Sequence, residues 1–280
     1  MSHERFVTRF APAPTGWLHL GHVLNAEHVW GRIASSSLPG EKQRRVLLRI
    51  EDHDRERCRP EYEAGILEDL AWLGYVWEAP LVRQSERDAI YRHAVSVLAG
   101  QGLVYACDCT RRAIEERTSR DKAAPDGALP GELRYPGRCR DRGIAVTDGV
   151  GWRVRMDPGV ERFVDAQLGP QEQDPSQQCG DVLIRDRLGN WTYQFAASVD
   201  DFAQGIDVVI RGADLLASTG RQIRLARLLG RDAPATFQHH RLMMKSATQK
   251  LSKSDGATGI RDLRARGLSA VGAQRLVRSA

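Results

Sequence analysis

The sequence predicts an α/β protein with a doubly wound, mostly parallel sheet, and two observations predict it. In the first hundred residues, short apolar segments typical of buried strands alternate with segments of helical period. The same order of strand and helix returns near residue 206, after a middle stretch of different character. With 280 residues, the chain can hold one large core or a main domain with an insert.

The first expected element is an apolar strand that ends at about Arg9. It leads into a loop that Pro12 and Pro14 stiffen, because proline fixes its own backbone angle. Thr15 and Gly16 relieve crowding before a helix start, whose free amides and dipole attract phosphate. We therefore interpret this stretch as a nucleotide site.

Two histidines three residues apart open that helix. His19 and His22 are expected on one helical face, where they add hydrogen-bond donors beside a bound phosphate. The structural alternative is a turn followed by a histidine pair that only caps or packs. Local physics weighs the two interpretations about equally.

Four further segments complete the expected first half. Residues 35–40 are typical of a loop, and residues 45–50 of a buried strand that ends at Glu51 and Asp52. Carboxylates at the end of such a strand point toward the usual ligand crevice of a parallel sheet. Helices are expected from Pro60 to Gly74 and from Ser85 to Gly100.

The composition changes near residue 105, so the middle part is expected to be an insert. It contains a basic segment from 111 to 117 and a run rich in proline and glycine from 123 to 137. Residues 151–156 alternate with the period of a strand, and residues 181–185 and 191–195 flank a Gly-Asn turn like a hairpin.

The second half of the sheet is expected to resume with a buried strand at 206–210 and a helix at 218–229. A short segment at 241–244 then leads to the Lys-Leu-Ser-Lys-Ser run at 250–254, and 26 residues follow. The predicted organisation is 1–104 for the first half of the fold, 105–180 for the insert, 181–245 for the second half, and 246–280 for the loop and a short helical extension.

Composition and charge restrict the class of protein. A hydrophobic content of 41% and a charged content of 28% are ordinary for a soluble protein and exclude disordered and collagen-like classes. The net charge of +5 permits an anionic partner, although a solvated basic surface explains it equally well. No signal peptide or membrane span is visible, so we expect a cytoplasmic protein.

Five cysteines are an odd number, and three of them cluster. In a reducing compartment this pattern favours metal binding or free thiols over disulfides. Cys107 and Cys109 are two residues apart and Cys139 follows after a loop, so three thiolates would leave one position of a tetrahedral zinc open. Reduced structural thiols without a metal are the alternative.

Two separated motifs carry a resemblance to a known family. The run from Pro14 to His22 and the Lys-Leu-Ser-Lys-Ser run together resemble the two signatures of class I aminoacyl-tRNA synthetases, which are ligases. Four further segments narrow the match to the catalytic core of glutamyl-tRNA synthetases: Arg9-x-Ala-Pro, Arg49-Ile-Glu-Asp-x-Asp54, Asp200-Asp201 and Ile210-Arg-Gly-Ala-Asp214. The resemblance implies a Rossmann-like nucleotide-binding fold over essentially the whole chain.

The short C-terminal part refines what the resemblance implies. Twenty-six residues cannot build the helical domain with which discriminating members grip the anticodon. The chain is similar to truncated paralogues that activate glutamate and attach it to the queuosine base of tRNA(Asp). The resemblance implies L-glutamate, ATP with Mg²⁺ and queuosine-carrying tRNA(Asp) as partners, no membrane, and a monomer. Two alternatives stay open, namely a truncated enzyme that charges tRNA(Glu) and a non-catalytic tRNA-binding module.

The resemblance also implies roles for residues around ATP. His19 and His22 would stabilise the pentavalent phosphate, and Lys253, with Lys250 assisting, would neutralise the leaving pyrophosphate. A solvated surface loop is the alternative for the lysines. The implied ATP contacts are Pro12, Thr15, Gly16, His19, Gly21, His22 and Lys253.

Glutamate carries three charges, and each needs a partner in a selective pocket. Arg9 and Arg211 offer forks for carboxylates, Glu51 can hold the ammonium group, and Tyr193 can donate its hydroxyl. A surface ion pair for Arg211 and half-buried packing for Tyr193 are the alternatives. Ala11 and Ala13 are also expected to contact glutamate. Ala13 stands where relatives usually have serine, which removes one possible hydroxyl contact to the substrate.

The resemblance adds a fourth ligand to the cysteine cluster. Tyr135 lies four residues before Cys139, matching a tyrosine that completes the zinc site in the resembled subfamily. Such a zinc would be structural and would stiffen the insert. Asp200 and Asp201 are expected to fix the fold beside the pocket. The basic stretches 111–120 and 261–278 either contact phosphate or form solvated faces.

Overall fold

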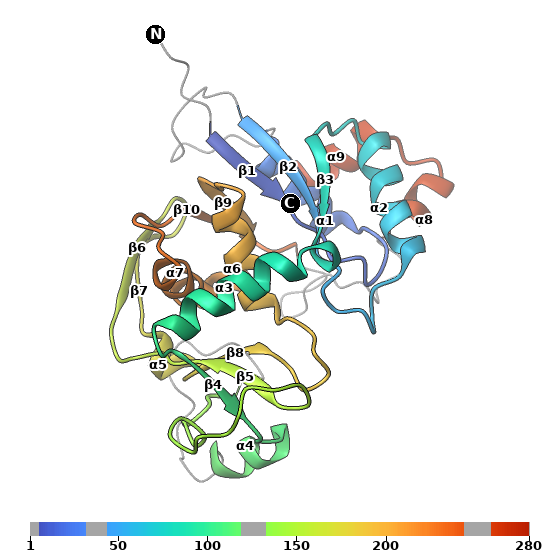
Figure 1. Ribbon diagram of the computed structural model, residues 1–280. Coiled ribbons are helices and arrows are strands. Elements are labelled where there is room, and N and C mark those ends of the chain that lie inside the picture. Colours follow the sequence, from blue (N-terminus) through green and yellow to red (C-terminus); the bar gives the residue numbers. More distant parts are fainter. Residues whose placement is uncertain (1–5, 32–43, 119–132, 244–258, 280) are drawn as a thin grey trace.

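The computed structural model describes residues 6–31, 44–118, 133–243 and 259–279 (Figure 1). Their strands form two sheets of mainly parallel pairing and one antiparallel sheet. The first sheet has the order β1-β2-β3, with β1 at Phe6–Phe10, β2 at Arg44–Ile50 and β3 at Glu78–Arg83. The second has the order β7-β6-β10-β9, with β6 at Glu161–Asp165, β7 at Gly169–Gln173, β9 at Val208–Gly212 and β10 at Thr236–His240.

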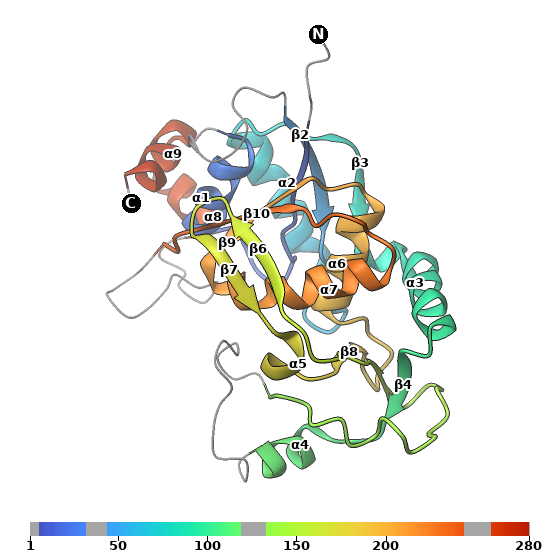
Figure 2. The same cartoon turned by 90° about the vertical axis from the view of Figure 1, so that its left-hand side faces the viewer.

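The antiparallel sheet forms a separate lobe. Its order is β4-β5-β8, with β4 at Val104–Cys107, β5 at Gly151–Val154 and β8 at Val182–Arg185. Figures 1 and 2 both show this lobe, together with helix α4 (Arg111–Thr118), at the end of the molecule away from β1 and β2. The predicted α/β class with an inserted α+β part is confirmed.

Helices cover the parallel sheets. None of the described helices is both long and apolar enough to cross a membrane. Besides α4, they are α1 (Leu20–Val29), α2 (Pro60–Trp72), α3 (Asp88–Gly100), α5 (Pro175–Gln178), α6 (Tyr193–Ala203), α7 (Thr219–Leu228), α8 (Ile260–Ala265) and α9 (Ala270–Arg278), with 3₁₀ turns η1 (Gln84–Glu86) and η2 (Ala213–Ser218).

The two parallel sheets meet at β1 and β9. Just before β9, the Asp207 amide donates to the Val7 carbonyl at 2.9 Å, and the Val7 amide donates to the Asp207 carboxylate at 2.8 Å. In β1 and β2, Arg9 pairs with Leu47 in parallel register. The carboxyl ends of β1, β2 and β9 therefore share one edge, which is where ligands bind in sheets of this kind.

One apolar core lies under this edge and includes the C-terminal helix. Leu48 and Ile50 of β2 and Leu70 of α2 are completely buried, and Val277 of α9 packs in the same cluster. Burying each such side chain contributes about 1.5–3 kcal/mol. Figure 2 shows α8 and α9 beside α1, so the expected helical extension belongs to the main body.

The expected hairpin at 181–195 is wrong in its second half. Residues 182–185 form β8, but Tyr193 begins helix α6, and Trp191 makes only an isolated bridge to Arg185. Phe195 and Val199 recur at helical spacing and are buried, so the apolar pattern belongs to a helix. The turn itself is closed by Asp186, whose carboxylate accepts from the amides of residues 188 and 190.

Two expected helices and one expected strand are present but begin at later residues than the sequence predicts. The helix expected at 85–100 begins at Asp88 after η1, and the helix expected at 218–229 begins at Thr219 after η2. The strand expected at 206–210 is β9, two residues further along. The strand at 45–50 and the helix from Pro60 are confirmed.

The sheets do not follow the expected limits of the insert. Strand β6, from within 105–180, pairs with β10 at Phe237 and Asp165. Strand β8, from the part assigned to the second half, pairs with β5. As a division into domains, the boundaries stay a prediction.

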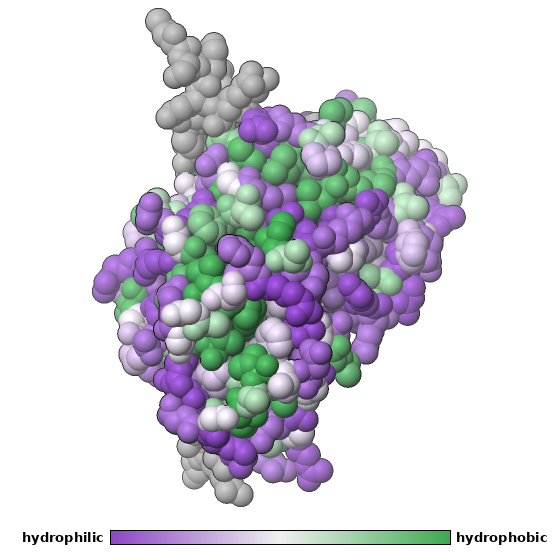
Figure 3. Space-filling model, viewed as in Figure 1, coloured by the Kyte–Doolittle hydropathy of each residue, from purple (hydrophilic) through white to green (hydrophobic). Residues whose placement is uncertain are grey.

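The surface shows no continuous apolar face in the view of Figure 3, where hydrophobic side chains are interspersed with hydrophilic ones. Among the described residues, the most exposed large apolar side chains stand on separate elements. They are Val76 before β3, Val164 on β6 and Leu188 in the turn after β8. Single exposed apolar residues of this kind are normal for a protein surface.

Candidate active site

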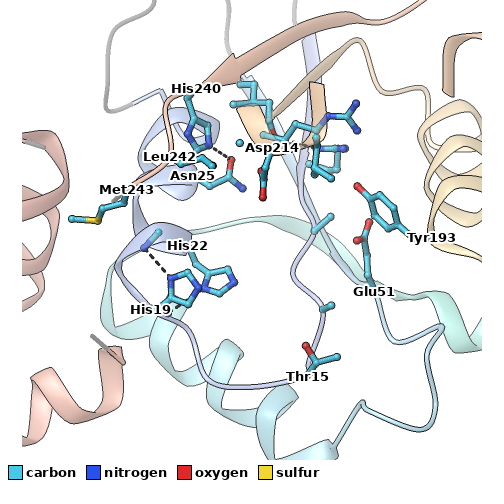
Figure 4. Close-up of a pocket in the computed structure, with 18 of the residues that line it drawn as sticks. Thr15, His19, His22, Asn25, Glu51, Tyr193, Asp214, His240, Leu242 and Met243 are labelled. Carbon is cyan, nitrogen blue, oxygen red and sulfur yellow. Dashed lines mark hydrogen bonds between the residues drawn. The ribbon is translucent and has the colours of Figure 1, made fainter. Parts of the chain in front are cut away.

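A cavity of about 600 Å³ lies at the shared edge of β1, β2 and β9, beside the N-terminus of α1 (Figure 4). It brings together most of the residues expected from the sequence. Lys250 and Lys253 lie outside the described residues, and Pro12 and Gly16 are not part of the lining. The expected residues that do line it are Arg9, Ala11, Ala13, Thr15, His19, Gly21, His22, Glu51, Tyr193 and Arg211.

The proline loop is fastened to the end of β2. The Pro12 carbonyl accepts from the Glu51 amide at 3.0 Å, and the Pro14 carbonyl accepts from the Arg59 amide at 3.0 Å. Both prolines are buried. Pro12 is not among the residues that line the cavity, and its expected contact with ATP stays a prediction.

The two histidines form a reciprocal cap at the start of α1. His19 is the cap residue rather than a helical residue, and its Nδ1 accepts from the Gly21 amide at 3.0 Å. The Nδ1 atom of His22 accepts from the His19 amide at 3.1 Å, and the ring centroids are 3.9 Å apart. Because each Nδ1 accepts an amide proton, the neutral rings carry their own protons on Nε2.

Gly21 is required by this cap. A Cβ atom at this position would lie 2.8 Å from Cε1 of His19, which is closer than real Cβ contacts. The backbone can approach the imidazole only because the side chain is missing.

Arg9 is held by an aspartate instead of being open on all sides. Its Nε donates to Asp201 Oδ1 at 3.0 Å, and Arg49 donates to the same oxygen at 2.8 Å. Burial opposes ionisation of Asp201, but the guanidinium groups of Arg9 and Arg49 outweigh it and lower the pKa of the carboxyl to about 2. Arg49 also donates to Glu51 at 3.1 Å, so these charges form one network.

The neighbouring Asp200 supports the network from the side of α3. Its carboxylate accepts from Gln84 at 2.9 Å, from Arg87 at 2.6 Å and from the Tyr91 hydroxyl at 2.8 Å. Neither Asp200 nor Asp201 lines the cavity. This arrangement agrees with their expected role in fixing the fold.

Arg211 is a buried cation surrounded by neutral acceptors. It donates to His239 Nε2 at 3.0 Å, to Gln222 at 2.6 Å and to Thr219 at 2.9 Å. Among the described residues, no carboxylate lies within ion-pair distance of it, and burial lowers its pKa. A buried guanidinium without an anionic partner is costly, so the site favours an anion from outside.

Glu51 and Tyr193 complete the set of polar groups. Figure 4 shows the Tyr193 hydroxyl and the Glu51 carboxylate pointing into the cavity. Burial raises the pKa of Tyr193, and the charge of Glu51 raises it further, so the hydroxyl stays protonated and can donate. Arg9, Arg211, Glu51 and Tyr193 therefore bring two cations, an anion and a neutral donor to this cavity, whose lining also contains Arg57, Asp54 and Asp214.

Several lining residues were given no role from the sequence. Asn25 and His240 lie close together, with His240 Nε2 3.1 Å from Asn25 Oδ1, and the His240 ring stacks on His28 at 4.7 Å. His53 also lines the cavity, as does Asp214. The adjacent histidines at 239 and 240, directly before the 241–244 segment, were the available signal for part of this set.

The three clustered cysteines come together in the antiparallel lobe. The Sγ atoms of Cys107, Cys109 and Cys139 all lie within 4.8 Å of one another. The Oη of Tyr135 is 3.4 Å from Cys107 Sγ and 3.8 Å from Cys109 Sγ, and the sulfurs of Cys109 and Cys139 are 3.6 Å apart. A tetrahedral zinc places ligand sulfurs about 3.8 Å apart and an oxygen about 3.5 Å from each sulfur, so the four donors fit zinc.

The electrostatics of this cluster favour the thiolate at Cys107 but not at Cys109, where burial and the hydrogen bond with Cys139 raise the pKa of the thiol to about 11. Burial opposes ionisation of Cys107, but hydrogen bonds from Tyr135 and Arg153 outweigh it and lower the pKa of the thiol. The Arg153 guanidinium lies 3.7 Å from the centroid of the Tyr135 ring. Burial raises the pKa of Tyr135, so the phenol would need a metal cation to lose its proton at neutral pH.

Some arginines of the two basic stretches form ion pairs within the protein. On α4, Arg111 and Arg112 form ion pairs with glutamates four residues on. In the C-terminal stretch, Arg264 pairs with Glu68 and Asp69, and Arg278 pairs with Glu27. These contacts favour the interpretation as solvated or packed faces.

The parallel sheet, the histidine cap at α1 and the charged cavity are those of a class I synthetase catalytic domain. Residues 5–271 match the family described as tRNA synthetases class I (E and Q), catalytic domain. The chain belongs to this family.

Curated relatives narrow the comparison. The chain is 43% identical over 256 residues to the glutamyl-Q tRNA(Asp) synthetase of Bordetella bronchiseptica, covering 91% of this chain and 77% of the relative. It is 40% identical over 286 residues to the glutamyl-Q tRNA(Asp) synthetase of Rhodobacter capsulatus, covering 97% and 99%.

Two solved structures that are similar to this chain are those of glutamate-tRNA synthetases. The glutamate-tRNA synthetase of Elizabethkingia anophelis superposes with a TM-score of 0.72 at 28% identity, over 91% of this chain and 54% of that one. A glutamate tRNA ligase from Elizabethkingia meningosepticum, in complex with its amino acid, gives the same TM-score over 53% of its length. This chain spans about half the length of those two proteins.

Proposed function

We propose that this protein activates glutamate with ATP to glutamyl-adenylate without tRNA, and transfers the glutamate to the queuosine base of tRNA(Asp). The observation that carries the proposal is Arg211, a buried cation with no carboxylate partner among the described residues. It lies in the same cavity as the N-terminus of α1. A carboxylate substrate and a phosphate substrate can therefore meet there.

The amino acid is recognised by complementary charge. Arg211 and the Tyr193 hydroxyl bind one carboxylate, Arg9 faces the other, and Glu51 holds the ammonium group. Ala11 and Ala13 form the backbone wall between them. Two observations support this assignment. All these residues line one cavity, and a similar solved structure is a glutamate tRNA ligase in complex with its amino acid.

ATP binds at the start of α1. The Nε2 protons of His19 and His22, at the positive end of α1, face phosphate oxygens as the glutamate α-carboxylate attacks the α-phosphate in line. The reaction forms one carboxylate–phosphorus bond and breaks the bond to pyrophosphate. Lys253, assisted by Lys250, neutralises the pyrophosphate, and Mg²⁺ accompanies ATP. Positioning and charge neutralisation supply the rate enhancement, since no covalent enzyme intermediate is needed.

The nucleic acid partner is proposed from the relatives. Those of Bordetella bronchiseptica and Rhodobacter capsulatus are named glutamyl-Q tRNA(Asp) synthetases, and the latter aligns over 99% of its length. An identity of 40–43% to proteins of that name favours the same substrate over tRNA(Glu). We further propose that the protein acts as a cytoplasmic monomer.

The cysteine cluster is proposed to hold one structural zinc. Cys107, Cys109 and Cys139 supply thiolates, and Tyr135 supplies the fourth donor. Bound there, zinc would join β4 to the segment around Tyr135 and stiffen the lobe. The cluster lies in a different lobe from the charged cavity, so the metal takes no part in activation.

Glutamate-dependent exchange of pyrophosphate into ATP, measured without tRNA, tests the proposal. We expect exchange with glutamate and none with aspartate, because the shorter side chain cannot reach both carboxylate partners. Exchange that requires tRNA would favour an enzyme that charges tRNA(Glu). Absence of exchange under all conditions would contradict adenylate formation.

A further inference from the structure

A second cavity, of about 420 Å³, shares one side chain with the candidate active site. Polar residues of η1, α3 and the turn after β8 line it, and His53 lines both cavities. Arg55 at its rim is exposed and makes no ion pair with a described residue. The cavity therefore suits a polar, anionic molecule that reaches the reacting atoms beside His53.

Hydrogen bonds fix which nitrogen of His53 carries the proton. The Gln84 amide nitrogen donates to Asp200 at 2.9 Å, and a carboxylate already paired with Arg87 can only accept. The Gln84 oxygen therefore faces His53, 2.6 Å from Nδ1. Because an amide oxygen only accepts, Nδ1 bears the proton, and Nε2 of the neutral ring is a lone-pair acceptor.

The backbone around His53 is fastened to the same turn. The neighbouring Asp52 carboxylate accepts from the Ser85 amide at 2.8 Å and from the Ser85 hydroxyl. The His53 ring centroid is 6.2 Å from that of Tyr193, a residue of the glutamate pocket. An imidazole with a fixed tautomer thus stands between the place for the activated amino acid and the second cavity.

We propose that His53 is the general base of the transfer step. Its Nε2 takes the proton from a hydroxyl group of the RNA that enters through the second cavity, as the hydroxyl oxygen attacks the carbonyl carbon of the adenylate. The bond from that carbon to the phosphate oxygen breaks, AMP leaves with the electron pair, and His53 returns the proton to solvent. This inference rests on the proposed function.

Activation has no such need. The attacking group there is a carboxylate, which has no proton to lose, so a base at His53 affects only the second half-reaction. This asymmetry separates a general base from a residue that merely shapes the pocket, because a pocket defect would impair both half-reactions.

His53→Asn is the sharpest variant. The asparagine amide can still donate to Gln84 but has no group in place of Nε2. We expect single-turnover transfer to RNA to slow about 100-fold, at least tenfold more than any change in pyrophosphate exchange. His93→Asn, an exposed histidine on α3, is the matched control and should change neither rate.

Imidazole rescue supplies a second readout. In His53→Gly, free imidazole should restore the transfer rate at least tenfold while leaving exchange unchanged. Normal transfer by His53→Asn, equal loss of exchange and transfer, or failure of imidazole to rescue would each overturn the proposal. Wild-type protein that neither activates nor transfers glutamate would instead contradict the proposed function, so the two failures are distinguishable.

Discussion

Arg211 is the residue on which amino acid recognition depends most. Its guanidinium is buried among Thr219, Gln222 and His239, and no described carboxylate forms an ion pair with it. The nearest acid in this chain of contacts is Asp165, which accepts from His239 Nδ1 at 2.6 Å. Burial lowers the pKa of His239, so the ring stays neutral and passes on little negative charge. The charge of Arg211 is left for a substrate carboxylate.

Replacing Arg211 by glutamine should therefore raise the KM for glutamate. A charge-assisted hydrogen bond contributes about 1.5–3 kcal/mol, which corresponds to a rise of roughly 10- to 150-fold. Steady-state exchange kinetics measure it, with the KM for ATP expected to change less than threefold. The exposed Arg162→Gln is the control, since Arg162 pairs only with Glu172 on the β6–β7 hairpin. Equal effects of the two substitutions would rule out the assigned role.

Asp201 should make stability depend on acid pH. Its folded pKa of about 2 lies below its ordinary value of 3.8, so it contributes stability above about pH 4 that is lost as pH falls toward 2. The contribution is on the order of 2 kcal/mol. In urea unfolding, the free energy of unfolding should fall less between pH 4 and 2 for Asp201→Asn than for wild type. At pH 7 the variant should be less stable than wild type. Parallel curves for the two proteins would contradict this.

At the scale of elements, the C-terminal helix α9 holds α1 in place. Glu27 of α1 is completely buried, and it accepts from Arg278 at 2.5 Å and from the Tyr75 hydroxyl. Because His22 lies on the same helix, α9 indirectly positions the proposed phosphate donors. Helix α9 thus belongs to the scaffold of the candidate active site, which composition alone did not indicate.

Arg278→Met should destabilise the protein by about 1–3 kcal/mol, because it removes a cation from a buried carboxylate while Arg278 itself is partly exposed. Chemical denaturation measures the change. Arg275→Met, on the exposed face of the same helix, should cost less than 0.5 kcal/mol. A destabilisation by Arg275→Met as large as that by Arg278→Met would mean that the ion pair with Glu27 is unimportant.

The cysteine lobe makes a separate prediction about metal. Purified protein should contain about one zinc per chain, and Cys139→Ser should lose it and unfold at a lower temperature. Tyr135→Phe should bind zinc more weakly, since three thiolates persist. Elemental analysis measures the metal, and Cys58→Ser is the control because Cys58 is outside the cluster. Zinc-free wild-type protein would leave the cluster as reduced thiols.

For the whole molecule, the sequence predicts the helices and strands that have regular apolar spacing. It does not predict elements whose polar side chains are stabilised by residues far away in the chain. The helix from Pro60 and the strand at 45–50 follow from regular apolar spacing. Strand β10 was missed because it buries polar side chains. Its His239 and His240 take partners from remote segments, among them Asp165 and Asn25. Trp191 to Phe195 misled because aromatic and β-branched residues also favour strands.

In the candidate site, too, the sequence predicted the types of residue but not the contacts between residues that are remote in the chain. Residue types in the motifs indicated cations for carboxylates and an acid for an ammonium group, and Arg9, Glu51 and Arg211 do meet in one cavity. The sequence could not indicate that Asp201 restrains Arg9 or that Gln84 sets the tautomer of His53, because those pairs are remote in the chain.

The identity of the glutamate acceptor decides whether the protein transfers glutamate to the queuosine base of tRNA(Asp). The protein is incubated with labelled glutamate and ATP and with one of three RNAs: tRNA(Asp) with queuosine, tRNA(Asp) without it, or tRNA(Glu). Nuclease digestion then locates the labelled nucleotide. We expect label only on tRNA(Asp) with queuosine, attached to the modified base. Label on the terminal ribose of tRNA(Glu), or on tRNA(Asp) regardless of queuosine, would contradict this proposal.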